Sequence, residues 1–127
     1  MPDTLYDALG GDPVVRRLVD RFYDHMDTLP GDVATVRAMH PPDLGESRDK
    51  LHWFLAGWLG GPQTYVERRG HPRLRARHFP FEVDVAARDA WMCCMDLALG
   101  EVVADADLRA GLSEALGRVA SHMQNRE

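Results

Sequence analysis

Apolar side chains recur every three or four residues along most of the chain, which predicts helices rather than strands. The clearest case begins after Gly10-Gly11, where Asp12 is an expected N-cap and Pro13 an expected first helical residue. This helix should run to about residue 28, before Pro30-Gly31. Its apolar face consists of Val15, Leu18, Val19, Phe22, Tyr23 and Met26.

The same periodicity predicts three more long helices: one from Glu46 or Ser47 to the break at Gly60-Gly61-Pro62, one over 85–100 capped by Asp84, and one over about 105–123. Shorter helical pieces are predicted over 4–9 and 33–39, with a loose turn or two within 62–69. No stretch alternates with period two for long enough to make a strand. The fold class is therefore expected to be all-α.

Periodicity alone does not distinguish a plain helical bundle from a globin-like sandwich. The glycine pairs at 10–11 and 60–61 favour the sandwich, because they let neighbouring helices turn sharply and cross closely. The region 60–83 is also too long and irregular for a bundle connection, and loops of that length are usually functional.

Composition narrows the possibilities. With 127 residues, 45% of them hydrophobic, the chain is expected to form one domain over 1–127. A net charge of −5 without a basic face argues against nucleic acid as the main partner.

No apolar run is long enough to cross a membrane and no signal-like region is present, so we expect a cytoplasmic protein. Cys93 and Cys94 are adjacent, which makes a disulfide between them awkward, and both are expected to be free thiols in a reducing compartment.

Candidate chemistry lies in residues 70–81, GHPRLRARHFPF, a short, irregular segment predicted to be poorly helical. His78 has Arg77 and Phe79 beside it, with Pro80 just behind. A haem ligand needs such surroundings: a neutral nitrogen for iron, apolar contacts for the porphyrin and arginines for its propionates. One alternative is a surface turn in which the histidine simply has its hydrogen bonds satisfied. Another is that His71 is the iron ligand instead of His78.

Four longer stretches carry a family resemblance: LYDALGGDPVVRRLVDRFYDHM at the start, MHPPDL at 39–44, WFLAGWLGGPQTYVERRGHPRLRARHFPF at 53–81 and RDAWMCCMDLAL at 88–99. Over nearly its whole length the chain resembles the group II truncated haemoglobins, the two-over-two helical globins of bacteria and plants. The resemblance implies a two-over-two helical sandwich that holds haem b (iron protoporphyrin IX).

The resemblance also implies residue roles. His78, in RARHFPF, matches the proximal histidine that ligates the haem iron. Tyr23, in DRFYDHM, matches the distal tyrosine, and Trp91, in RDAWMCC, the tryptophan that faces bound ligand. His40, in AMHPPD, matches a distal corner position that is variously tyrosine, phenylalanine or histidine in this family.

On the distal helix, the resemblance places Ser47 and Leu51 towards the iron and Phe54 one turn further along, while His52 should point away. The usual ligand-gating site then has no histidine. Three further residues are expected near the haem propionates: Arg75, Arg77 and Tyr65.

Together these residues suggest the chemistry. Dioxygen on ferrous haem gains negative charge, which donors on Tyr23 and Trp91, and on His40 in the suitable tautomer, would stabilise. We therefore expect high-affinity binding of dioxygen, and of carbon monoxide or nitric oxide, in a pocket that Leu51 and Phe54 keep dry.

Other functions stay open at this stage. One is a haem redox enzyme, a nitric oxide dioxygenase or a peroxidase-like protein, which would need an external reductase because no flavin or dinucleotide motif is present. Another is a helical interaction module without haem, in which Tyr23 and Trp91 are ordinary core aromatics. The sequence does not distinguish a monomer from a homodimer.

Overall fold

The computed structural model describes residues 3–126, and within that range it contains helices and no strand. The helices are α1 (Leu5–Leu9), α2 (Asp12–Thr28), α3 (Asp32–Ala38), α4 (Gly45–Trp58), α5 (Thr64–Arg69), α6 (Leu74–His78), α7 (Val85–Val102) and α8 (Ala106–Met123). The expected all-α class is confirmed.

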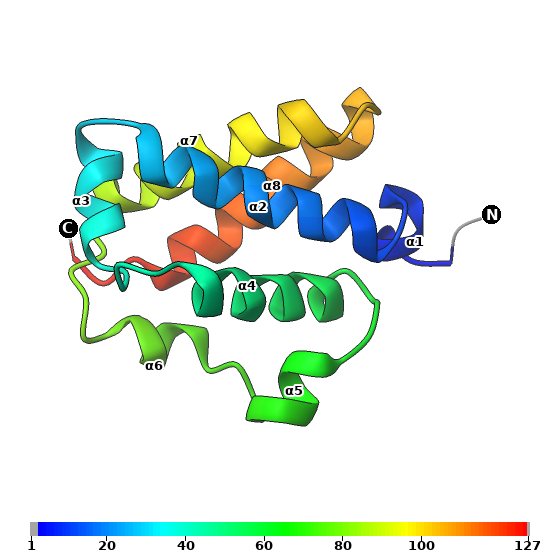
Figure 1. The fold of residues 1–127 in the computed structure, drawn as a ribbon, viewed down its shortest axis with the longest axis horizontal. Helices are drawn as coiled ribbons and strands as arrows, with labels where there is room; N and C mark the ends of the chain where they lie inside the picture. Colours follow the sequence, from blue (N-terminus) through cyan, green and yellow to red (C-terminus); the bar gives the residue numbers. More distant parts are fainter. Residues whose placement is uncertain (1–2, 127) are drawn as a thin grey trace.

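The four long helices form two layers. α2 packs against both α4 and α7, and α7 packs against α8, so the pair α2–α4 lies on the pair α7–α8 (Figure 1). The short helices α5 and α6 lie on the side of α4 that faces away from α2 (Figure 1). This is the two-over-two sandwich that the resemblance implied. None of the described helices is long and apolar enough to cross a membrane.

All six apolar residues predicted for the first long helix are buried in α2, with exposed fractions from 0% to 6%. The start of the helix differs from the prediction. Gly11, at φ +79°, is the N-cap, and Asp12 is already helical. The left-handed backbone of Gly10 and Gly11 sets the start of α2, so the prediction that Asp12 caps it was wrong.

The Asp12 carboxylate instead ties three helices together. It accepts hydrogen bonds from the Tyr6 hydroxyl of α1 at 3.2 Å and from His52 Nε2 of α4 at 2.8 Å. The other predicted cap is confirmed, because the Asp84 carboxylate accepts from the backbone N–H of Ala87 at the start of α7.

The apolar stripe predicted for the second long helix is only partly buried in α4. Leu55 and Leu59 are 1% and 4% exposed, whereas Leu51, Phe54 and Trp58 stay half-buried. Leu51 and Phe54 line a cavity, which is why they do not join the core.

The segment that precedes α7 is more helical than the sequence suggested. α5 accounts for most of the turn expected over 62–69, and α6 forms a single five-residue turn that ends at His78. Arg73, at φ +47°, redirects the chain into α6.

The residues after α8 hold this segment in place; we call Gln124–Arg126 the C-terminal strap. The Asn125 amide donates to the carbonyls of His78 and Phe81, both at 3.1 Å, and accepts from the Val83 N–H at 2.9 Å. The backbone N–H groups of Asn125 and Arg126 also donate to the Val83 carbonyl. The end of α6, which carries His78, and the turn that follows it are thus fastened to the chain just after α8.

Candidate functional site

A cavity of about 360 Å³ lies between α4 and α6, with further walls from α2, α3, α7 and α8. Its size falls within the range of about 300–1,000 Å³ that small-molecule and cofactor sites occupy. Its lining is predominantly apolar, with a few polar side chains converging on it. Of the candidate residues, it brings together Tyr23, His40, Ser47, Leu51, Phe54, Tyr65, Arg77, His78 and Trp91.

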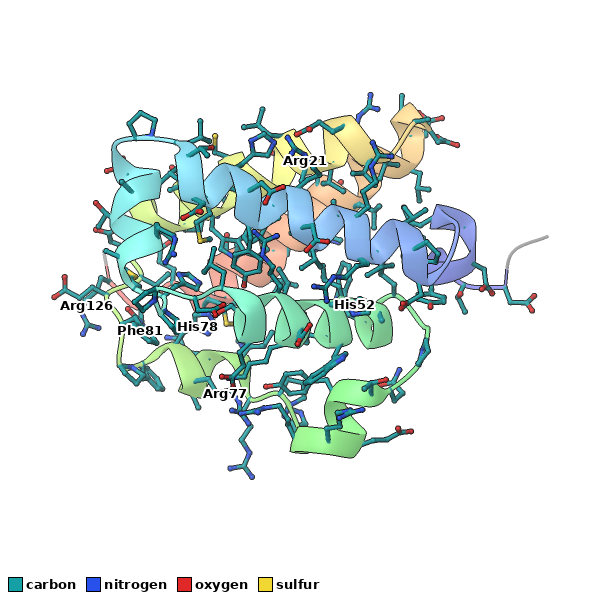
Figure 2. The ribbon with its side chains drawn as sticks, in the orientation of Figure 1. Arg21, His52, Arg77, His78, Phe81 and Arg126 are labelled. Atoms are coloured by element: carbon teal, nitrogen blue, oxygen red, sulfur yellow. The ribbon has the colours of Figure 1, made fainter. Side chains whose placement is uncertain are left out.

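His78 ends α6 and reaches the cavity half-buried (Figure 2). Its Nδ1 lies 2.6 Å from the Leu74 carbonyl oxygen. A carbonyl only accepts, so Nδ1 carries the proton and the neutral ring presents the lone pair of Nε2. Metal-bound histidines are commonly oriented by this kind of Nδ1–H bond to a backbone carbonyl.

His71, the alternative ligand, lies outside the cavity lining and is exposed. Its Nδ1 accepts the backbone N–H of Arg73 at 3.0 Å. The side chain therefore belongs to the turn that starts α6.

Tyr23 is 6% exposed, yet its hydroxyl has no hydrogen-bond partner within residues 3–126. Its ring packs at right angles to those of Phe22 and His40, with centroid distances of 4.9 and 5.9 Å. Burial raises the pKa of the phenol well above its ordinary value, although the Arg48 guanidinium acts in the opposite direction. The hydroxyl thus stays protonated and its O–H remains available in the cavity wall.

Trp91 projects from α7 into the same cavity, where its ring packs 5.0 Å from that of Phe22. No acceptor for its indole N–H occurs in the described part of the chain. Two donors without protein partners, one on α2 and one on α7, therefore line one cavity.

His40, just after α3, is oriented in the same way as His78. Its Nδ1 lies 2.9 Å from the Val36 carbonyl oxygen, so the neutral ring has its lone pair on Nε2. Burial lowers the pKa of His40 and the charge of Arg37 adds to that effect, while the bond to Val36 opposes it. In this tautomer the side chain offers an acceptor at Nε2, not the N–H donor that the other tautomer would provide.

α4 supplies Ser47, Leu51 and Phe54, as expected, and Phe54 packs edge-on to Tyr65 with centroids 6.4 Å apart. His52 lies on the side of α4 that faces α2, where it binds Asp12 (Figure 2). The expectation that His52 points away from the site agrees with this position.

Of the arginines expected near the propionates, only Arg77 lines the cavity. Its Nε donates to the Pro72 carbonyl at 2.7 Å, and its guanidinium lies 5.9 Å from the centre of the Tyr65 ring. Arg75 points elsewhere, because its guanidinium donates to the carbonyls of His122 and Gln124 at 2.7 and 3.2 Å.

Sequence reasoning missed several lining residues. Lys50 is a second cation at the cavity; the signal for it was its place beside Leu51 on α4. Arg88 also lines it, with its guanidinium committed to the Gly117 carbonyl and the Ser121 hydroxyl. The apolar wall includes Met39, Leu74, Phe81, Leu116, Val119 and Met123, of which the α8 members look like ordinary core positions in the sequence.

An all-α sandwich with an apolar cavity, oriented imidazoles and cationic side chains in its lining has the features of a haem-binding globin. Comparison with known proteins leads to the same class. Residues 4–125 match the model of the family described as bacterial-like globin.

Solved structures and curated relatives place the chain more narrowly. It is 48% identical to the group II 2-on-2 haemoglobin of Agrobacterium tumefaciens, with a TM-score of 0.94 over 99% of this chain and 97% of that one. It is 42% identical to a cold-adapted truncated haemoglobin of Pseudoalteromonas haloplanktis, also with a TM-score of 0.94, over 98% and 100% of the two chains. It is 38% identical to the group 2 truncated haemoglobin YjbI of Bacillus subtilis, over 94% of this chain and 87% of that protein.

The chain belongs to the bacterial-like globin family, as a group II truncated haemoglobin. Membership of this family implies that it binds haem and small gaseous ligands.

Proposed function

We propose that this protein binds dioxygen and other diatomic ligands with high affinity, at haem b ligated by His78. One observation carries the proposal: the free Nε2 of His78 and the unpartnered hydroxyl of Tyr23 meet at the same apolar cavity.

The residues present fit haem. The apolar lining suits a porphyrin, and Leu51 and Phe54 exclude water from its face. Arg77 and Lys50 are cations that can pair with the propionates, and Tyr65 can donate a hydrogen bond to one of them. Arg75 is not assigned this role, because it lies outside the cavity lining and donates to the carbonyls of His122 and Gln124.

When bound, ferrous haem supplies an iron atom that holds a diatomic ligand and shifts negative charge onto it. The role of the chain is to stabilise that charge. Tyr23 and Trp91 each offer a donor without a protein partner, and such a bond to a charged acceptor contributes about 1.5–3 kcal/mol. Each donor would therefore slow ligand escape about ten- to a hundredfold.

We also propose a cytoplasmic location, which the free thiols of Cys93 and Cys94 suit because thiols stay reduced there. An external reductase would keep the iron ferrous. Sedimentation analysis would distinguish a monomer from a homodimer.

Titration of the apoprotein with haem tests the proposal. We expect a one-to-one endpoint, a sharp Soret band, and on reduction a carbon monoxide complex with a histidine-type spectrum. His78→Gly should lose tight haem retention unless imidazole is added, whereas His71→Gly, at the exposed neighbour, should bind as the parent protein does. Unsaturable uptake by the parent protein, or normal retention by His78→Gly, would contradict the assignment.

A second function, haem-based redox chemistry of the nitric oxide dioxygenase or peroxidase-like kind, is favoured by one observation. His40 places a basic nitrogen in the cavity, which simple dioxygen storage does not require. Turnover of nitric oxide or peroxide with an added reductant, compared between the parent protein and His40→Phe, would test it.

A further inference from the structure

Two histidines of this cavity are oriented in the same way. In each, Nδ1–H donates to the carbonyl four residues earlier, Leu74 for His78 and Val36 for His40, which leaves Nε2 with a lone pair. Both side chains line the cavity. The proposed iron site uses only one of these lone pairs, so the other needs its own explanation.

We propose that His40 is the proton acceptor of the cavity, taking the proton from small weak acids as their anions bind ferric haem. This inference rests on the proposed haem site. The ligand class is H–X, where X is cyanide, hydrosulfide or hydroperoxide. The H–X bond breaks, its electron pair stays on X, and the proton forms a bond to His40 Nε2. The ring becomes an imidazolium, and no oxidant or reductant is consumed.

The other polar side chains at the cavity are poorly suited to this task. Tyr23 is a protonated phenol and Trp91 has only a donor. Lys50, Arg77 and Arg88 are cations, and His78 is assigned to the iron. Among the described lining residues, His40 is therefore the side chain with an uncommitted basic lone pair.

The surroundings of His40 keep it ready to accept a proton. Burial lowers its pKa below the ordinary value of 6.5, so the ring is neutral when a protic ligand arrives. The Val36 carbonyl accepts from Nδ1–H in both the neutral and the protonated ring, so accepting a proton requires no rotation of the side chain. The edge-on Tyr23 ring, with centroids 5.9 Å apart, limits the tilt of the imidazole.

The decisive experiment compares a protic ligand with an aprotic one in the holoprotein. Cyanide, added at neutral pH where it is present as hydrogen cyanide, must lose a proton to bind ferric haem; carbon monoxide binds ferrous haem without proton transfer. General-base help typically accelerates a proton transfer about 10²–10⁴-fold. Stopped-flow mixing should show cyanide association slowed by about that factor in His40→Phe, with carbon monoxide association nearly unchanged.

Two variants sharpen the comparison. His40→Gln keeps a polar side chain that lacks a basic nitrogen, so it should be slowed like His40→Phe. His40→Gln also replaces His40→Phe in the comparison if the phenylalanine variant folds poorly. His52→Phe is the matched control, because His52 is half-buried on α4 but bound to Asp12 away from the cavity. It should leave both ligands unaffected.

A measurement on the apoprotein tests the tautomer without haem. NMR of the ring nitrogens should show His40 protonated at Nδ1 and bare at Nε2. A proton on Nε2, or an unchanged cyanide rate in both His40 variants, would overturn the proposal. So would equal slowing of cyanide and carbon monoxide, or a ferric low-spin spectrum that disappears in His40→Phe and marks His40 as an iron ligand. Failure of the parent protein to bind haem would instead refute the proposed function.

Discussion

The Tyr23 hydroxyl is available to a ligand in the cavity, and the stability of the fold does not depend on a hydrogen bond from it. Its ring is part of the core, while its O–H has no partner among residues 3–126 and opens into the cavity. Since no protein hydrogen bond is lost, Tyr23→Phe should leave the melting temperature of the apoprotein nearly unchanged.

The same change should alter ligand release strongly. Removing a donor worth about 1.5–3 kcal/mol should accelerate dioxygen dissociation about ten- to a hundredfold, as measured by stopped-flow displacement. Tyr6→Phe is the matched control, because the Tyr6 hydroxyl binds Asp12 outside the cavity. A release rate that is the same in Tyr23→Phe and the parent protein would remove Tyr23 from the ligand site.

The adjacent cysteines should behave differently. Cys93 is exposed, whereas Cys94 is 0% exposed and burial, with a smaller contribution from Cys93, raises its pKa to about 11. Because the thiolate is the reactive form, a thiol reagent at mildly alkaline pH should modify one group per native chain. Cys93→Ser should abolish that reaction and Cys94→Ser should preserve it; two equally fast thiols would contradict this arrangement.

At the scale of helices, the C-terminal strap decides how firmly α6 is held. The Asn125 side chain makes three hydrogen bonds to the backbone of residues 78–83, and each contributes about 0.5–1.5 kcal/mol. Asn125→Ala should therefore speed haem loss at least about tenfold, as measured by transfer to an excess of an acceptor apoglobin.

Gln124→Ala is the control for the strap, since among residues 3–126 the Gln124 side-chain amide donates to the nearby Arg126 carbonyl alone. It should lose haem as slowly as the parent protein. If both variants retain haem equally well, the strap does not stabilise the segment that carries His78.

The helices themselves follow from local pattern, but their junctions and the cavity do not. The apolar stripe of α2 was predictable because every one of its residues is buried in the core. The position of Asp12 was not, because the left-handed glycines before it, rather than its own capping tendency, fix the start of the helix. Arg75 was predicted to lie near the propionates. Its guanidinium instead binds two carbonyls that lie 47 and 49 residues further along the chain, around the end of α8, and local sequence pattern does not reveal such distant partners.

The site was predictable where the family pattern marks it, and for His78 also from the residues around it. His78, Tyr23 and Trp91 reach the cavity as the resemblance implied. The tautomer of His40 depends on a backbone carbonyl whose position only the fold provides. The cavity wall from α8 was missed because Val119 and Met123 continue the same apolar stripe as core residues, and periodicity does not separate the two.

At the scale of the whole molecule, a continuous series of ion pairs crosses the layers from α4 through α2 to α7. It runs through Asp49, Arg16, Asp20, Arg48, Asp24, Arg21 and Glu101. The Glu101 carboxylate also contacts the His25 ring. Arg48 also lies 5.8 Å from the centre of the Tyr23 ring, so the series reaches a side chain that lines the cavity. Networks of this kind stabilise more than isolated surface pairs do.

The α7 end of this series predicts a pH effect. The bond to His25, and then that to Arg21, lowers the pKa of Glu101 below its ordinary value of 4.5. A lowered carboxyl pKa stabilises the fold above that ordinary value, and the effect is lost as the pH falls through the folded-state pKa. Glu101→Gln should therefore be less stable than the parent at neutral pH, and the difference should shrink on acidification.

Urea unfolding at several pH values measures this difference. Glu67→Gln, which removes the same charge from α5, is the control and should show no such trend. A stability gap for Glu101→Gln that is constant down to acid pH would mean that the carboxylate charge is not what matters.

The strap also has a consequence for biosynthesis. Asn125 leaves the ribosome 47 residues after His78, yet it fastens the segment that presents this histidine. A nascent chain can pack α2, α4 and α7 beforehand, but His78 is not secured until Asn125 has emerged. Stable cofactor capture should then follow the synthesis of α8 and the strap, and a chain truncated before Asn125 would resemble a globin in most of its fold while holding haem poorly.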